Sequence, residues 1–283
     1  MTTRKFSINR QTLSRLPGYL ILNFWVVFTA VLIGWILIAS LSTTREIFTN
    51  TLLESGVHFS NYVQALITHN VGRYFMNSLF YTVTAGVGII VIAAPCAYVL
   101  ARFPFPGNRL IQNMFVGSLG VPQIMIILPL FYLSSLLRLT NSRGLLVLLY
   151  VCLNVPFTVF FLMSFFSTLS TSFEEAAAMD GCSPVRTFWT IMFPLAQPGI
   201  ITVGIFNFIV LWNEFFIALI FANTSDLRPL AVGLYTMVQS MRYIGDWAGM
   251  FSAVVIVFVP TFLLYIFLSE KIIAGVTGGA IKE

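Results

Sequence analysis

The stretch YFMNSLFYTVTAGVGIIVIAAPCAYVLA, residues 74–101, contains no Asp, Glu, Lys or Arg. It exceeds the ~20 residues that an α-helix needs to cross the hydrocarbon core of a bilayer. The fold therefore depends on how many such runs the chain holds. The other uncharged runs lie at 16–44, 110–137, 144–173, 187–213 and 247–269. This pattern predicts an all-α membrane protein with six transmembrane helices.

The fifth of these runs is interrupted by a single acid, Glu214, and then continues as FFIALIF. We expect its helix to pass through that acid and to cover about 198–222. Each of the six runs contains proline, which membrane helices tolerate as bends or hinges.

The composition of the whole chain agrees with a membrane protein. Apolar residues make up 58% and charged residues 9% of the chain, whereas a soluble domain has about 45–50% and about 25%. The net charge of +5 does not indicate nucleic-acid binding, because the basic residues flank apolar runs and form no stripe for phosphates. Three cysteines without a CxxC spacing and two histidines predict neither a disulfide framework nor a metal site.

An even number of spans puts both chain ends on one side of the membrane. The first residues carry several basic side chains and no acid, which favours the cytoplasmic side. We therefore expect a cytoplasmic tail at 1–15, a first helix with its outer loop at 16–69, a core of five helices at 70–270 and a second cytoplasmic tail at 271–283. The longest loops, 45–73 and about 223–246, then lie outside the membrane.

A cluster of acids beside an alanine run, EEAAAMDG, lies between the fourth and fifth spans. Ser172 with Glu175, or Thr171 with Glu174, fits the capping box of a helix N-terminus. The three alanines that follow are strong helix formers. The sequence predicts a short helix on the cytoplasmic side of the membrane.

Gly181 can adopt the left-handed conformation that ends a helix. Ser183-Pro184 then fits the cap and first residue of a second short helix, which leads through Phe193-Pro194 into the fifth span. A small helix with a charged start suits docking into a groove of another protein. An ordinary capped loop helix explains the same spacing, so the residues alone leave both interpretations open.

The spacing of this loop resembles the EAA motif of ABC-importer permeases. Glu175-Ala176-Ala177 is followed after three residues by Gly181, and after nine more by Ile191-Met192-Phe193-Pro194. Phe193 stands where leucine is usual, and Ser170 stands where many members of the family have proline.

Further segments resemble the carbohydrate, maltose-type branch of that family, in the same order along residues 70–283. They are Asn77-Ser78-Leu79, AYVLARFPFPG at 97–107, LWNEFFIALIF at 211–221 and GVTGGAIK at 275–282. The resemblance implies the type I ABC importer permease fold and transport of a sugar or oligosaccharide across a bacterial or archaeal cell (inner) membrane.

The resemblance also implies the partners. A second homologous permease, two copies of an ABC ATPase subunit and an extracytoplasmic solute-binding protein would complete the importer. The residues agree, because a P-loop needs GxxxxGK[ST] and none of the lysines follows a glycine. We expect no enzyme activity and no cofactor in this chain, with ATP and Mg held by the partner ATPase.

The resemblance assigns the coupling of ATP hydrolysis to the loop at 170–194, with Glu175 as the residue that pairs with the ATPase. The candidate coupling residues are Glu174, Glu175, Ala176, Ala177, Ala178, Met179, Asp180, Gly181 and Pro194. It also implies that the tail reaches the ATPase through Gly275, Gly278, Gly279 and Lys282, although composition alone favours a frayed terminus.

Polar side chains inside the spans are candidates for the transport path. We single out Asn207, Trp212, Asn213 and Glu214 as a possible lining or gate, because sugars need hydroxyl partners and aromatic faces. Hydrogen bonds between helices are the alternative explanation for such groups.

Three alternative functions remain open. A secondary transporter would show inverted repeats and acids in the middle of a span. A membrane-embedded enzyme would show a polar catalytic cluster within the spans. A permease for an amino acid or phosphate would lack the sugar-type elements. The first two alternatives would differ from an ABC permease in these features of the sequence. The third would differ only in the sugar-type elements, which are identified by resemblance.

Overall fold

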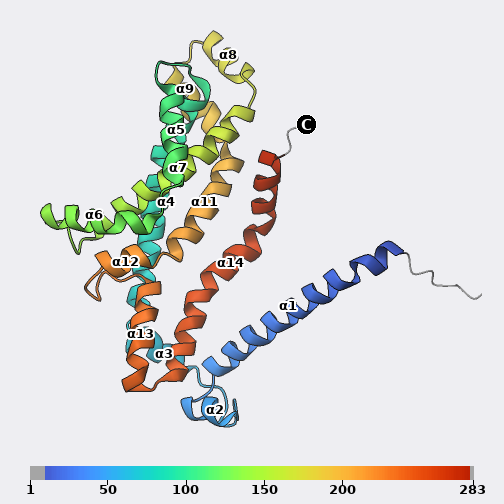
Figure 1. Cartoon of the computed structure of the whole chain (residues 1–283), viewed down its shortest axis with the longest axis vertical. Coiled ribbons are helices and arrows are strands. Elements are labelled where there is room, and N and C mark those ends of the chain that lie inside the picture. The colour runs from blue at the N-terminus through green and yellow to red at the C-terminus, as the bar shows by residue number, and fades with distance from the viewer. Residues whose placement is uncertain (1–9, 281–283) are drawn as a thin grey trace, which may run out of the picture. The chain divides into compact units, whose positions relative to one another are not determined.

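The computed structural model describes residues 10–280, and these residues form helices and loops without a strand (Figure 1). They fall into two compact units: the chain up to Thr68 with Ser240–Val255, and His69–Gln239 with the residues from Ile256 onward. The helices are α1 Arg10–Ser40, α2 Thr44–Thr49, α3 Ser60–Ile67, α4 Val71–Arg102, α5 Asn108–Leu119, α6 Gln123–Leu136, α7 Arg143–Thr168, α8 Ser172–Met179, α9 Pro184–Thr187, the π-helix η1 Phe188–Met192, α10 Phe193–Leu195, α11 Gln197–Trp212, α12 Phe216–Phe221, α13 Leu230–Ile244 and α14 Trp247–Ala280.

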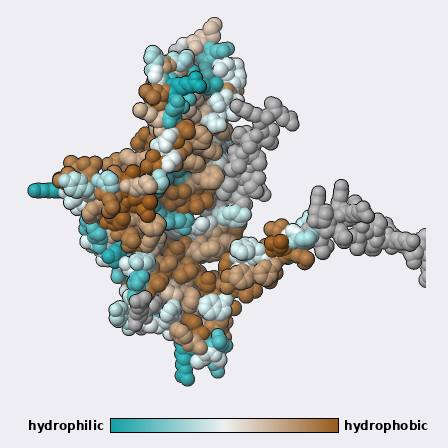
Figure 2. Space-filling model, viewed as in Figure 1, coloured by the Kyte–Doolittle hydropathy of each residue, from teal (hydrophilic) through white to brown (hydrophobic). Residues whose placement is uncertain are grey.

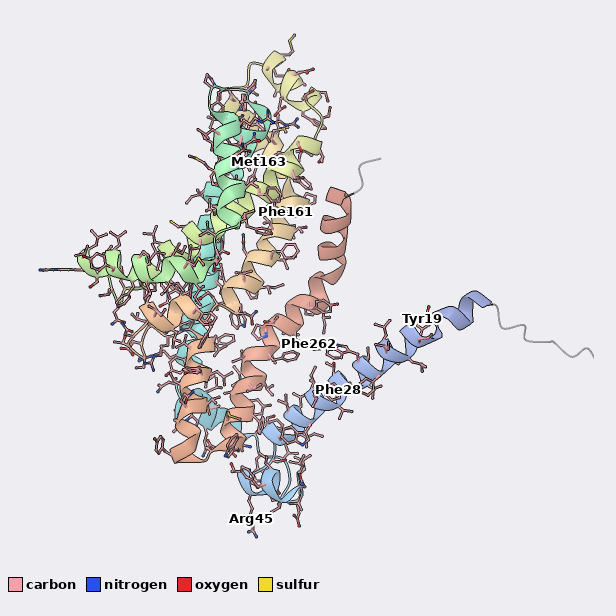
Figure 3. The ribbon with its side chains drawn as sticks, in the orientation of Figure 1. Tyr19, Phe28, Arg45, Phe161, Met163 and Phe262 are labelled. Carbon is pink, nitrogen blue, oxygen red and sulfur yellow. The ribbon has the colours of Figure 1, made fainter. Side chains whose placement is uncertain are left out.

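In the first unit, polar groups hold the end of α1. The Asn61 amide donates to the carbonyl oxygens of Ser40 and Ser42 at 3.0 and 2.9 Å, and the Ser252 hydroxyl donates to the Ser40 carbonyl at 3.0 Å. The apolar stretch of α1 before this point is exposed, with Tyr19 and Phe28 extending from the helix (Figure 3). Such a surface suits lipid or another apolar protein surface rather than water.

The second unit is built on α4 and α7, with α11 packed against both. Ala85, Ile89, Ala93 and Ala97 of α4 follow a spacing of four and are all completely buried. Small residues on one helix face let neighbouring backbones approach closely. At Gly88, an added Cβ would lie 3.1 Å from a Val151 methyl group of α7, which shows how near the two helices come.

The structure agrees with the six-span prediction when each bent helix pair counts as one span. Among the described residues, α1 from Pro17, α4, α7 and α14 up to Phe267 are long and apolar enough to cross a membrane. Two further candidates are α5 with α6 and the segment Pro184–Leu195 with α11. The two longest loops between spans also contain α2, α3 and α13, which we did not predict.

The third predicted span is not one straight helix. Its two halves, α5 and α6, meet at an angle of 100°. Pro122 lies between them with φ −61° and ψ 123°, an extended conformation. Proline supplies no N–H for a helical hydrogen bond and disfavours helix at the residue before it, so the run breaks here.

The fifth span is also broken, and the expected continuous helix over about 198–222 is wrong. The chain bends by 74° before α11, and α11 ends at Trp212 rather than passing through Glu214. The next helix, α12, begins only at Phe216. The apolar sequence continues on both sides of Glu214, but one helix ends before this acid and the next begins after it.

The two ends of α4 lie at opposite ends of the second unit (Figure 1). Near its first turns, the Asn77 amide donates to the carbonyl oxygens of Asp226 and Arg228 at 2.8 and 3.0 Å, and Arg73 pairs with Asp226. Its last residue, Arg102, contacts the segment that holds α8. Hydrophilic residues gather at the α8 and α9 end, and apolar ones cover much of the surface around α6 and α7 (Figure 2).

Candidate coupling site and membrane path

Helix α8 carries most of the predicted coupling residues and ends as the sequence predicts. Gly181 has φ +75°, the left-handed region that favours glycine. The N–H of Gly181 donates to the Ala178 carbonyl at 3.0 Å, and the N–H of Cys182 donates to the Ala177 carbonyl at 2.9 Å. These two bonds form a Schellman motif, which satisfies carbonyls that the helix end would leave free.

The second short helix also begins as predicted. The Ser183 hydroxyl accepts a hydrogen bond from the Arg186 N–H at 3.4 Å, and Pro184 is the first residue of α9. The π-helix that follows was not predicted. Pro194 supplies no N–H to the carbonyl four residues before it, and the Phe193 N–H bonds to the Phe188 carbonyl, five residues back. A proline just beyond this turn is a physical reason for the wider winding.

The start of α8 differs from the prediction, because no capping box forms. Thr171 precedes the helix in a helical conformation, and its side chain makes no cap hydrogen bond. Glu174 and Glu175 instead have their N–H groups bonded to the Thr171 carbonyl, at 3.0 and 3.1 Å. The Ser170 hydroxyl accepts from the N–H of Ser172 at 3.3 Å.

The carboxylate of Glu174 turns away from the helix start because it pairs with Arg102, the last residue of α4. Glu174 Oε1 lies 3.5 Å from Arg102 Nε, with the two side chains only 21% and 9% exposed. The Arg102 guanidinium also donates to the carbonyl of Leu169, just after α7. We expected Glu174 to serve the helix end; the structure gives it an ion pair within the chain.

The remaining coupling residues divide between two faces of α8. Ala177 is 2% exposed and faces inward, where α8 packs against α9 and the π-helix. Met179 is 88% exposed, and the other outward residues, Glu175, Ala176, Ala178 and Asp180, are also exposed. Among the described residues, Glu175 has no ion-pair partner. Pro194 belongs to α10, beyond the π-helix, and is exposed.

The tail residues that we expect to contact the ATPase lie at or beyond the end of the residues that the structure describes. Gly275, Gly278 and Gly279 lie in the last turns of α14, whose helical backbone continues to Ala280. Lys282 lies outside the described residues.

Two of the predicted path residues are buried among the helices. Asn207 is 2% exposed, and its amide donates to the Thr158 hydroxyl of α7 at 3.0 Å. Trp212 is 2% exposed, stacks on Phe208, and donates from its indole nitrogen to the Val257 carbonyl at 3.3 Å. Both side chains therefore connect helices, as polar groups in membrane proteins often do.

Glu214 caps α12 and also joins it to α7. Its Oε1 accepts from the N–H of Ile217 at 2.7 Å, and its Oε2 accepts from the N–H of Ala218 at 3.1 Å and from the Tyr150 hydroxyl at 2.7 Å. Asn213 is exposed, and its amide donates to the carbonyl of Ile209 at 2.8 Å. The structure does not bring the four predicted path residues together around one space.

A pocket of about 510 Å³ lies at the bend between α5 and α6 and is also lined by α7 and α11. Asn207 reaches it, and so do Gln123, Asn154, Phe157 and Phe206, which were not among the predicted site residues. The Asn154 amide donates to the Tyr150 carbonyl at 2.8 Å, and the rings of Phe157 and Phe206 meet edge to face with centroids 6.4 Å apart. The site thus combines amide groups with aromatic rings; the amides in the spans were the sequence signal for it.

Most of the chain is similar to known membrane transport proteins. Residues 86–273 match the family described as binding-protein-dependent transport system inner membrane component. The chain is 37% identical over 266 residues to the diacetylchitobiose uptake system permease protein NgcG of Streptomyces coelicolor, with 94% of this chain and 88% of the relative covered.

Two other relatives and one solved structure are similar over most of their length. The sulfoquinovosyl glycerol transport system permease protein SmoH of Agrobacterium fabrum is 30% identical, covering 88% of this chain and 87% of the relative. The trehalose/maltose transport system permease protein MalG of Thermococcus litoralis is 29% identical, covering 88% and 90%. A chain of a bacterial ABC transporter involved in the import of alginate has a TM-score of 0.83 and 22% identity, covering 94% of this chain and 99% of that one, which shows the shared fold.

Proposed function

This chain belongs to the family of binding-protein-dependent transport system inner membrane components, and we propose that it is a permease subunit of an ATP-driven importer for a sugar or oligosaccharide. The observation that carries the proposal is the geometry of α8. This short helix is held to the chain on one side, and its outer side exposes Glu175 and Met179 beyond the ends of the spanning helices.

The energy for transport comes from another subunit in this proposal. The sequence holds no GxxxxGK[ST] motif, so the phosphates of ATP have no P-loop in this chain. We infer that two copies of an ABC ATPase bind ATP and Mg, that a second homologous permease completes the path, and that an extracytoplasmic binding protein delivers the sugar. The chain lies in the cell (inner) membrane, with both termini and α8 on the cytoplasmic side.

Docking of the ATPase on α8 combines charge and apolar contact. Glu175 pairs with a basic residue of the ATPase, while Ala178 and Met179 become buried in its groove. An exposed ion pair contributes only about 0.2–1 kcal/mol, so the apolar contacts supply most of the affinity and the acid fixes the register. If docking removes the pair from water, loss of one partner costs about 2–5 kcal/mol.

Sugar is the substrate class that the relatives and the pocket support together. The relatives reported above are named for diacetylchitobiose, sulfoquinovosyl glycerol and trehalose or maltose. In this chain the pocket offers the amides of Gln123 and Asn154 for sugar hydroxyls and the rings of Phe157 and Phe206 for sugar faces. We propose that this pocket lines part of the path.

The C-terminal segment supplies a second contact with the ATPase in this proposal, through Gly275, Gly278, Gly279 and Lys282. Deletion of residues 275–283 then lowers sugar-stimulated ATP hydrolysis in the assembled importer. An unchanged rate of hydrolysis would remove the tail from the proposal without affecting α8.

The test of the function is purification of the chain with everything it retains from its own membrane. We expect a P-loop ATPase and a second permease with its own EAA-like loop, and sugar uptake when the complex is placed in vesicles with the binding protein. Glu175→Lys strongly weakens retention of the ATPase, because charge repulsion is added to the loss of the pair, whereas Glu54→Lys, the same charge change on an exposed acid outside the coupling loop, leaves retention unchanged. Recovery of a homo-oligomer that transports without ATP would overturn the proposal.

A further inference from the structure

We propose that Arg102, at the end of α4, is a positioning residue that holds Glu174 so that the coupling helix α8 moves together with α4. The inference rests on the proposed function, because it concerns how movement of the ATPase reaches the spanning helices. It assigns different tasks to the two neighbouring glutamates: Glu174 binds within the chain, and Glu175 binds the ATPase.

The side chain of Arg102 makes the contacts that carry this proposal. Arg102 joins three segments, because its guanidinium donates to the Leu169 carbonyl after α7 and lies 3.5 Å, from Nε to Oε1, from Glu174 of α8. One turn earlier on α4, the Tyr98 ring packs against Phe103, Phe166 and Phe188, which holds this end of α4 to α7 and to the π-helix.

Helix α4 connects the two ends of the second unit (Figure 1). The helix has 32 residues, which at 1.5 Å per residue gives a length of about 48 Å. At its other end, Asn77 and Arg73 hold the segment around Asp226. Energetic coupling between distant sites needs packed or hydrogen-bonded elements between them. Through Arg102, a displacement of α8 reaches this long helix directly instead of passing through the loop that precedes α8.

The ion pair between Arg102 and Glu174 is buried and long. Arg102 Nε and Glu174 Oε1 are both buried, and neither has a hydrogen-bond partner among the described residues. Their distance of 3.5 Å is longer than the about 2.7–2.9 Å of a charge-assisted hydrogen bond. The Glu214 carboxylate, by contrast, accepts hydrogen bonds from three donors between 2.7 and 3.1 Å. The looser Arg102–Glu174 pair has room to shorten or lengthen as α8 moves.

The experiment compares Glu174→Gln with Glu175→Gln in the complete importer in vesicles. The two variants remove the same charge from adjacent residues, one paired inside the chain and one exposed. We expect Glu174→Gln to retain the ATPase with affinity within about twofold of the unsubstituted protein and to import about tenfold less sugar per ATP, the factor that corresponds to about 1.4 kcal/mol. Glu175→Gln instead weakens ATPase binding.

Three further variants separate positioning from general stability. Arg102→Lys keeps the charge and restores part of the ratio lost in Arg102→Met. The double variant Arg102→Met with Glu174→Gln loses no more than the worse single variant, because both remove one contact.

The outcomes distinguish the inference from the function on which it rests. If the unsubstituted chain retains no ATPase, the proposed function itself fails. If it imports sugar with ATP and Glu174→Gln does so with an unchanged ratio, only the positioning role is overturned. The role is equally overturned if Glu174→Gln weakens ATPase binding as much as Glu175→Gln, or if the losses in the double variant multiply.

Discussion

The hydroxyl of Tyr150 donates to the Glu214 carboxylate at 2.7 Å, inside the second unit. This bond joins α7 to the break between α11 and α12, where the same carboxylate also accepts from two backbone N–H groups. An acid that interrupts an apolar run therefore serves as the hydrogen-bonded joint of a broken helix. Tyr150 itself is 1% exposed, so the joint is closed off by packed side chains.

Replacement of Glu214 by alanine should destabilise the protein more than it alters transport selectivity. The change leaves the Tyr150 hydroxyl and two N–H groups without their acceptor, and we expect a loss of about 2–3 kcal/mol in the free energy of unfolding. Asn213→Ala is the matched control, because that exposed side chain makes one local bond to Ile209. Thermal unfolding of the purified protein gives the comparison. A stable Glu214→Ala protein with altered sugar preference would instead support a gate.

Gly181→Val should uncouple ATP hydrolysis from uptake while the protein still inserts. No neighbouring atom lies within 4 Å of the added Cβ, so the cost comes from the backbone, whose φ is +75°. A non-glycine residue in this conformation costs about 1–2 kcal/mol, and the strain is relieved by changing the angle between α8 and α9. Gly181→Asn is the control, since asparagine tolerates the left-handed region. Wild-type uptake by the valine variant in vesicles would contradict the prediction.

Two similar sequence patterns show how much of this site could be read in advance. Thr43 and Glu46 form a complete capping box at α2, with the Thr43 N–H bonded to Glu46 Oε2 at 2.8 Å and the Glu46 N–H bonded to Thr43 Oγ1 at 3.3 Å. Thr171 and Glu174 have the same spacing but form none, because Arg102 takes the Glu174 carboxylate. Local spacing predicts which bonds are available, and a residue distant in sequence decides which one forms.

The membrane-spanning helices also show where prediction from the sequence stops. Hydropathy located all six apolar runs, and the glycine and Ser-Pro signals located both ends of the loop between α8 and α9. The bends at Pro122 and before α11 could not be placed, because proline permits a straight, kinked or broken helix, and packing selects among them. The pocket escaped prediction for the same reason, since it exists only where α5 and α6 turn away from each other.

Acid should weaken the loop after α1 over a defined pH range. Hydrogen bonds from the Ser55 hydroxyl and from the N–H groups of Thr43 and Ser55 lower the pKa of Glu46 from 4.5 to about 2. Because the folded pKa lies below the unfolded value, the stabilisation is complete above pH 4.5 and is lost as the pH falls toward 2. The protection of residues 44–55 against hydrogen exchange, measured relative to the intrinsic exchange rate at each pH, should therefore fall as the pH is lowered across this range. Glu46→Gln should remove the pH dependence, and Glu54→Gln, an exposed acid in the same loop, should keep it.

The pocket leads to a prediction about sugar rather than ATP. Asn154→Leu keeps the approximate size of the side chain and removes the amide that could meet a sugar hydroxyl. A site that hydrogen-bonds its substrate loses affinity when a polar partner is removed, because the remaining groups stay unpaired. We expect sugar uptake to fall at least about fivefold, equivalent to about 1 kcal/mol, while retention of the ATPase stays unchanged.

Asn113→Leu is the matched control for this prediction. Asn113 lies on α5 and lines a different hollow, of about 360 Å³, with Gln112, Phe160 and Ser164. The same amide-to-alkyl change there should leave uptake close to that of the unsubstituted protein, because no sugar hydroxyl reaches it in our proposal. Equal losses in both variants would indicate damage to helix packing. No loss in Asn154→Leu would mean that the path runs elsewhere, against the partner permease rather than through the bend between α5 and α6.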